Sequence, residues 1–242
     1  MPERAGMSVA VLALLALAVA VASFVQGVTG VGFALIVAPV AGLVEPSLLP
    51  VFLLVLMIPL NLYIAGRERG SLDRAGAGWI TAGRFAGTFG GLWVLVAVPV
   101  GQLNLLVGGS TVLAAVVTLL APKFTPGRGA FLAAGAITGV TETATGVGGP
   151  PLALVYQHRP AAVLRSTVAV CFIAGEVISL AVLLITGKVG ADQLWPAAVM
   201  LPALVLGAGL SRFVHHRLDG PLMRLLVQLF AIVSGVALLF AG

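Results

Sequence analysis

The chain contains few charged residues. They make up 9% of its 242 residues, whereas 60% of the residues are hydrophobic and the mean hydropathy is +1.15. Typical soluble domains carry about 25% charged residues, and no stretch of this chain has the polarity of a separate soluble domain. We therefore predict a single membrane domain over residues 1–242, an all-α integral membrane protein.

Several other features of common protein classes are missing. The single cysteine, Cys171, excludes an intramolecular disulfide framework. We find no nucleotide-binding motif and no spacing typical of metal ligands, so we expect no cofactor, no metal and no direct use of ATP. Glu142 and a nearby threonine do not make a nucleophile–base–orienter set, which disfavours an intramembrane enzyme. The net charge of +5 lies in predicted loops, where it suits membrane topology and not nucleic-acid binding.

Two polar, glycine-bearing interruptions lie inside long apolar segments about 116 residues apart. They read Gln26-Gly-Val-Thr-Gly-Val-Gly32 and Glu142-Thr-Ala-Thr-Gly-Val-Gly148. An unwound backbone in lipid is tolerated only where it is buried in protein or lines a water-filled cavity. Paired breaks in two halves of a membrane protein therefore indicate a transporter whose binding site lies where the breaks meet.

The two halves resemble each other beyond these breaks. Each half carries small residues at every fourth position of a later apolar segment, a spacing that lets helix backbones pack closely in lipid. We infer a duplication, with one copy over residues 8–121 and the other over 129–241. The small residues are Gly83, Gly87 and Gly91 in the first copy and Ala203, Gly207 and Ser211 in the second.

Each copy is expected to contain a broken segment followed by three full spans. If the broken segments are re-entrant hairpins, most of the lysines and arginines fall on one side of the membrane, as the positive-inside rule requires. A hairpin plus three spans makes the two repeats inverted, with both termini external. The first broken segment is also long enough to cross, so its path stays open. The predicted spans are 47–65, 78–98, 102–121, 164–186, 193–211 and 221–241.

The breaks suggest an anion site near the membrane midplane. A half-helix N-terminus offers free N–H groups and the positive end of its dipole, glycine admits a ligand close to the backbone, and threonine hydroxyls can add donors. The alternative is that these glycines only allow tight helix crossings. The candidate substrate-binding residues are Gln26, Thr29, Gly30 and Gly32 at the first break and Thr145, Gly146, Gly148 and Gly149 at the second.

Four further polar residues in the spans are candidates for proton coupling or a polar network. Glu142, at the position equivalent to Gln26, could take up a proton or brace the break. Glu176 is costly in apolar surroundings and is either a proton site or a polar contact between helices. We expect Asn61 to serve helix packing. For Arg84 we favour snorkelling to the basic interface, with anion attraction or pairing with Glu176 as alternatives.

The sequence Gly-Val-Thr-Gly-Val-Gly-Phe followed by Pro39, and its echo Thr-Gly-Val-Gly-Gly-Pro-Pro, resemble the TauE/SafE sulfite-exporter-like permeases, also called the toluene-sulfonate uptake permease family. The resemblance covers residues 8–241. It implies transport of sulfite, thiosulfate or organosulfonates in a bacterial inner membrane. Many members continue the glycine run where Phe33 follows Gly32 here, so the pocket size and the substrate stay open.

We therefore expect a secondary transporter for a small sulfur-containing anion, working by alternating access as one repeat rocks against the other. An anion channel of the same fold and a transporter of small carboxylates are the alternatives. The expected partners are the anion and the lipid bilayer. The stripes of small residues permit a homodimer without requiring one.

Overall fold

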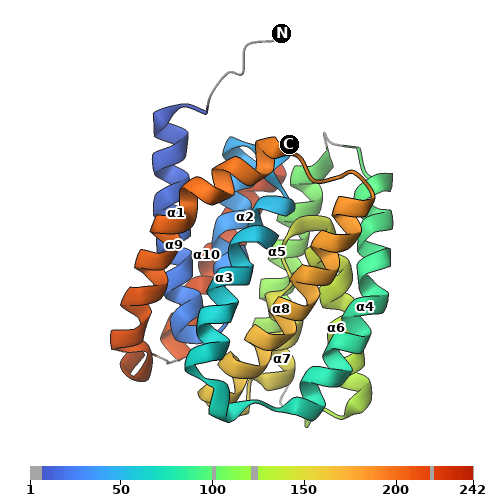
Figure 1. Ribbon diagram of the computed structural model, residues 1–242, viewed down its shortest axis with the longest axis vertical. Helices are drawn as coiled ribbons and strands as arrows, with labels where there is room; N and C mark the ends of the chain where they lie inside the picture. The colour runs from blue at the N-terminus through green and yellow to red at the C-terminus, as the bar shows by residue number, and fades with distance from the viewer. Residues whose placement is uncertain (1–6, 100–101, 121–124, 219–220, 242) are drawn as a thin grey trace.

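The computed structural model describes residues 7–99, 102–120, 125–218 and 221–241, and in these ranges the regular elements are all helices (Figure 1). Short 3₁₀ turns, η1 (Pro46–Leu48) and η2 (Arg69–Ser71), flank α3. The α-helices are α1 (Val9–Thr29), α2 (Phe33–Val44), α3 (Val51–Arg67), α4 (Arg74–Ala97), α5 (Leu103–Leu120), α6 (Arg128–Thr145), α7 (Gly149–Tyr156), α8 (Ala161–Ile185), α9 (Ala191–Leu218) and α10 (Pro221–Ala241).

The protein is a multi-pass membrane protein. Helices α1, α4, α8 and α9 are long and apolar enough to cross a membrane, and α2, α3, α5 and α10 contain shorter apolar stretches. Each of the six predicted spans coincides with a helix. The helix at the predicted span 47–65 begins only at Val51, because Pro46 opens a 3₁₀ turn and Pro50 lies just before α3.

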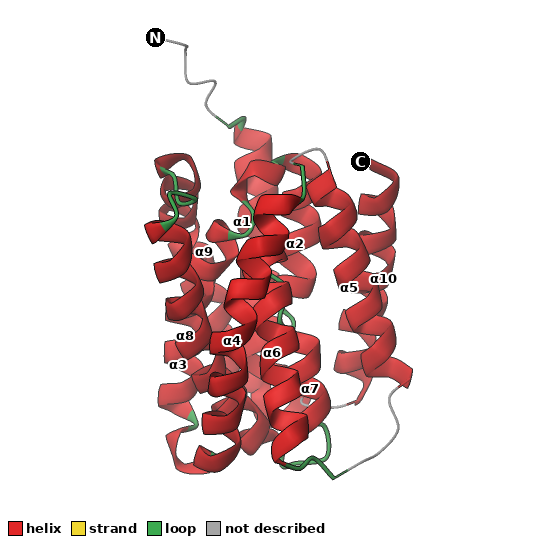
Figure 2. Cartoon of the chain, turned by 90° about the vertical axis from the view of Figure 1, so that its right-hand side faces the viewer, coloured by secondary structure: helices red, strands yellow, loops and turns green. Residues whose placement is uncertain are grey.

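Both broken segments fold back on themselves as helical hairpins. The rings of Phe131 near the start of α6 and Tyr156 at the end of α7 stack with centroids 5.5 Å apart, so α7 returns to the side from which α6 enters. In the first hairpin α2 returns toward the end at which α1 begins, where Gly42 packs on Leu238 of α10. Figure 2 shows that α1 begins and α10 ends at the same end of the bundle. The helices α1 and α6 enter from opposite ends, as inverted repeats require; the two-fold relation itself stays a prediction.

One end of the bundle is rich in arginine, and we call it the basic end. There α3 and α7 end and α4, α6 and α8 begin, as the lower part of Figure 1 shows. The described arginines at or next to these helix ends are Arg67, Arg69, Arg74, Arg128, Arg159 and Arg165.

The stripes of small residues bring helix pairs into backbone contact. A Cβ added at Gly83 or Gly87 of α4 would collide with a carbonyl oxygen of α6, and one added at Gly207 of α9 would collide with the Ala20 carbonyl of α1. The pair α4–α6 and the pair α9–α1 therefore pack in the same manner. These stripes therefore serve contacts between helices of the same chain.

Candidate anion site and buried polar network

The two breaks have the same local structure. Each helix ends at a left-handed glycine, Gly30 with φ 86° and Gly146 with φ 81°, and the N–H of that glycine donates to a carbonyl four residues back. The acceptors are the Gln26 and Glu142 carbonyl oxygens, both at 2.7 Å. A residue with a side chain rarely adopts this backbone conformation, which explains the glycine at both positions.

The threonines of the breaks fasten the turns. The Thr29 hydroxyl lies 3.0 Å from the Val25 carbonyl oxygen, and the Val31 N–H donates to Thr29 Oγ1 at 3.3 Å. The Thr145 hydroxyl likewise donates within its own helix, and the Val147 N–H donates to it at 3.2 Å. Each hydroxyl is thus within hydrogen-bonding distance of a backbone carbonyl of its own helix.

The breaks meet inside the protein, but they do not offer equal numbers of donors. The Val31 side chain lies against Gly149, where an added Cβ would be 3.7 Å from Val31 Cβ. Helix α2 begins at Phe33, whereas α7 begins Gly149-Pro150-Pro151. Because proline has no N–H, the first turn of α7 has fewer donors than the first turn of α2. An anion held by backbone N–H groups is therefore better served by the first break.

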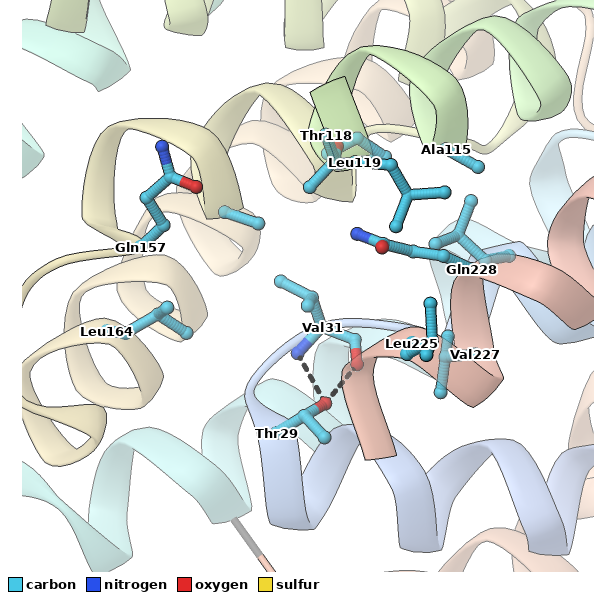
Figure 3. Close-up of a pocket in the computed structure, with 13 residues that line it drawn as sticks. Thr29, Val31, Ala115, Thr118, Leu119, Gln157, Leu164, Leu225, Val227 and Gln228 are labelled. Atoms are coloured by element: carbon cyan, nitrogen blue, oxygen red, sulfur yellow. Dashed lines mark hydrogen bonds between the residues drawn. The ribbon is translucent and has the colours of Figure 1, made fainter. Parts of the chain in front are cut away.

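A cavity of about 550 Å³ lies between the first break and the basic end. Figure 3 shows Gln157 of the α7 terminus and Gln228 of α10 on opposite sides of it, with Thr29 and Val31 at its inner boundary. No charged side chain is among the described residues that line it. These are Thr29, Val31, Leu35, Ala115, Thr118, Leu119, Pro150, Ala153, Gln157, Leu164, Leu225, Val227 and Gln228.

Of the predicted substrate-binding residues, Thr29 alone is among the described residues that line this cavity. Gly30 is pressed against Leu164 and Arg165, and Gly32 lies close to Val227. The second break is packed in protein: Gly146 lies against Leu53, and an added Cβ on Gly148 would be 2.9 Å from Glu142 Cβ. The residues of α5 and α10 that line the cavity belong to no distinctive motif, and the sequence analysis did not predict them.

Gln26, Asn61 and Glu176 form a buried chain of hydrogen bonds across three helices. Gln26 Nε2 donates to Asn61 Oδ1 at 2.9 Å, and Asn61 Nδ2 donates to Glu176 Oε1 at 2.8 Å. At the other end, the Phe33 N–H donates to Gln26 Oε1 at 2.9 Å and is thereby capped. The side chains of Gln26, Asn61 and Glu176 are almost fully buried. The structure thus gives Asn61 a polar role between helices as well as a packing role.

The expected snorkelling of Arg84 is wrong. Its side chain is fully buried and forms an ion pair with Glu142, which is also fully buried. Helix α4 starts at Arg74, earlier than the predicted 78, so Arg84 lies near the middle of the helix and not near the interface. A guanidinium in that position is held by a carboxylate partner because burying it alone would be too costly.

Arg84 and the chain of amides belong to one network. The guanidinium lies 5.5 Å from the Phe172 ring centroid and against Gly175, which leaves room for it, and it interacts electrostatically with Glu176. The structure therefore joins all four network candidates, Glu142, Glu176, Asn61 and Arg84. Two carboxylates and one guanidinium leave one negative charge uncompensated, so this network has the composition to hold a proton.

Two arginines at the basic end hold the last carbonyl groups of α1. Arg67 donates to the Gly27 oxygen at 2.6 Å, and Arg165 donates to the Val28 oxygen at 3.2 Å and to Glu68 at 2.9 Å. Cations at a helix C-terminus are stabilising because they satisfy these carbonyls and complement the helix dipole. Sequence reasoning counted Arg67 and Arg165 only as interfacial charges, and their position in the sequence does not set them apart from the other arginines.

Comparisons with known proteins agree with this architecture. The family model described as sulfite exporter TauE/SafE matches residues 15–238. No curated protein and no solved structure matches the chain with significant similarity. The members of that family are membrane transporters of sulfite-type anions and not enzymes. With nearly the whole length matched, the chain belongs to the TauE/SafE sulfite exporter family.

Proposed function

We propose that the protein is a secondary transporter that carries a small sulfur-containing anion, such as sulfite, thiosulfate or an organosulfonate, by alternating access. The anion is held in the cavity at the first break, and its movement is coupled to that of protons through the network around Arg84. The membrane is the bacterial inner membrane.

The position of the cavity is the observation that carries this proposal. The first hairpin contributes Thr29 and Val31 to its inner boundary, and the second contributes Pro150 and Ala153. A ligand in this space therefore touches both broken helices. Movement of one hairpin against the other changes its surroundings, as alternating access requires.

Neutral donors are available to hold an anion in this cavity. In the first turn of α2 the Phe33 N–H is capped by Gln26, which leaves the N–H groups of Ala34 and Leu35 and the positive end of the helix dipole for an anion. The side chains of Gln157 and Gln228 lie on opposite sides of the cavity, and their amide groups can supply further donors (Figure 3). Neutral donors bind an anion without the strong attraction of a lysine or arginine, which favours release on the opposite side.

Flux of sulfite and thiosulfate into proteoliposomes tests the proposal, and Gln228→Leu is the informative variant. It keeps the side-chain volume similar and removes the amide from the cavity. A hydrogen bond to a charged group contributes about 1.5–3 kcal/mol, so KM is expected to rise about 10-fold to 150-fold. Gln102→Leu is the matched control because Gln102 is exposed and lies outside the cavity.

Saturable flux that is impaired in Gln228→Leu and normal in Gln102→Leu supports a carrier site in the cavity. Unchanged kinetics in both variants would remove the anion from this cavity. Flux that does not saturate would favour the anion channel, and flux of small carboxylates in place of both sulfur anions would reassign the substrate.

A further inference from the structure

A single line of hydrogen bonds connects the buried carboxylate of Glu176 with the start of α2. It runs from the Phe33 N–H through the side chains of Gln26 and Asn61 to Glu176 Oε1, with distances of 2.9, 2.9 and 2.8 Å. The same end of α2 borders the cavity, since Val31 and Leu35 line it. The chain of three hydrogen bonds thus ends at Phe33, a buried residue that lies in sequence between the two lining residues Val31 and Leu35.

The direction of these hydrogen bonds is fixed by the backbone. A backbone N–H can only donate, so the atom of Gln26 that faces Phe33 must be its oxygen. Gln26 must then present its nitrogen to Asn61, and Asn61 must present its nitrogen to Glu176. As long as Phe33 is capped, Oε1 of Glu176 can only be an acceptor.

Protonation of Glu176 at Oε2, which is buried and has no hydrogen-bond partner among the described residues, would leave this arrangement intact. Protonation at Oε1, the oxygen that the relay requires, conflicts with it. A proton on that oxygen would point at the NH₂ group of Asn61, and two donors cannot form a hydrogen bond with each other. The conflict is relieved when the side-chain amides of Asn61 and Gln26 flip, which exchanges the positions of their oxygen and nitrogen atoms. Asn61 then accepts from Glu176. Gln26 then faces the Phe33 N–H with its own NH₂ group, and the cap on α2 is lost.

We propose that Gln26 and Asn61 act as a relay that links proton uptake by Glu176 to release of the α2 N-terminus at the anion cavity. The proposal rests on the proposed transport function and specifies how its proton and anion sites communicate. An anion at the break offers the released N–H a new acceptor. Anion binding and proton binding therefore favour each other, by reciprocal linkage. The predicted mode is movement of proton and anion in the same direction, with Gln26 and Asn61 as positioning residues.

The surroundings of Glu176 allow it to hold a proton. Arg84 faces it from α4 and is itself paired with Glu142 of α6, while Cys171 on α8 interacts with Arg84. The amides of Asn61 and Gln26 are the groups that α3 and α1 present to the network. Arg84 already pairs with Glu142. Glu176 is therefore the carboxylate whose negative charge a proton can neutralise.

The first test follows the hydrogen bond at the Phe33 N–H in the absence of substrate. Protein labelled with ¹⁵N-phenylalanine is reconstituted in nanodiscs, the Phe33 amide signal is assigned with Phe33→Leu, and its shift is followed against pH. We expect the signal to titrate in the wild type and to stay flat in Glu176→Gln and in Asn61→Leu. Ser179→Ala is the control, because Ser179 makes a buried 2.8 Å hydrogen bond to Thr143 outside the relay, and it is expected to titrate like the wild type.

The second test measures coupling with thiosulfate, which takes up no proton near neutral pH. Proteoliposomes held at zero membrane potential receive a pH gradient of one unit, acid on the side of the anion. One proton per anion gives about tenfold accumulation in the wild type and in Ser179→Ala. Asn61→Leu is expected to equilibrate thiosulfate without accumulating it.

The two tests separate failure of the relay from failure of the transport proposal. A Phe33 signal that is flat in the wild type, or that titrates unchanged in Asn61→Leu, would overturn the relay whatever the protein transports. Full accumulation by Asn61→Leu would overturn it as well. Absence of wild-type flux for thiosulfate and sulfite, with a titrating Phe33 signal, would refute the assigned substrates and leave the relay standing.

Discussion

Replacement of Arg84 by leucine is expected to be among the most damaging single changes in this protein. The variant removes the cation between two carboxylates and leaves both Glu142 and Glu176 in a fully buried site. It also removes the group that packs against Phe172 and Gly175. The damage therefore comes mainly from charge left without a partner.

The magnitude follows from the burial of the pair. Loss of one partner from a buried ion pair costs about 3–5 kcal/mol because the remaining charge is uncompensated. For a chain of this length, each kcal/mol lowers the unfolding temperature by about 2–4 °C. Arg84→Leu is expected to lower it by about 6–20 °C. Acidification should recover part of the loss, since protonation neutralises the carboxylates.

The single cysteine provides the assay. Cys171 is fully buried on α8, so a thiol-reactive fluorescent dye labels it only as the protein unfolds with rising temperature. Arg128→Leu is the matched control: Arg128 is exposed and lies 5.7 Å from the Trp79 ring, an interaction that contributes about 0.5–1 kcal/mol.

The double variant Arg84→Leu with Glu142→Gln tests the electrostatic explanation directly. It removes the carboxylate that Arg84 contacts, and we expect it to recover more than half of the lost unfolding temperature. An unfolding temperature for Arg84→Leu equal to that of Arg128→Leu, or a double variant no better than the single one, would refute the reasoning.

Three further predictions concern packing and the second break. Gly87→Val forces a side chain into the α6 backbone and should cost about 1–3 kcal/mol in thermal unfolding, whereas Gly78→Val on the same helix enters open space and should cost much less. Tyr156→Phe removes the 3.0 Å hydrogen bond to Asp73 and should cost about 1.5 kcal/mol; an unchanged unfolding temperature would contradict this. Gly146→Val, at a φ of 81°, should abolish flux per inserted protein without preventing insertion, and wild-type flux would argue against a functional break.

The breaks and the helices could be predicted from the sequence because their causes are local. A glycine with positive φ ends α1 and α6, and the threonine before it fastens the turn, so the same short pattern produces the same structure twice. Apolar segment lengths and the distribution of arginines favoured hairpins at the breaks, although they left the path of the first broken segment open.

The inward position of Arg84 could not be predicted in the same way, because it depends on which face of α4 meets α6. One signal was available. Thr88 follows Arg84 at i+4, on a helix face next to the glycine stripe, and its hydroxyl donates to the Arg84 carbonyl at 2.9 Å. Two polar residues beside a close-packing stripe indicate a buried face more than an interfacial one.

The cavity was beyond sequence reasoning for a different reason. Its volume depends on how α5, α7 and α10 are spaced by tertiary packing, and its lining residues are mostly ordinary apolar ones. The choice of the first break over the second also depends on packing. Leu53 and Glu142 fill the space at the second break, while the first borders on open volume.

The close contacts between α4 and α6 and between α9 and α1 bear on how the molecule can move. Backbones that touch at successive small residues cannot slide or separate without losing many contacts at once, so each pair travels as one body. Each body combines a hairpin helix from one predicted copy with a later span from the other. A rocking motion would therefore not divide the protein at the midpoint of its sequence, as two repeats moving against each other would require. The two parts that move would be built around the pair α4–α6 and the pair α9–α1, and each would contain helices from both predicted copies.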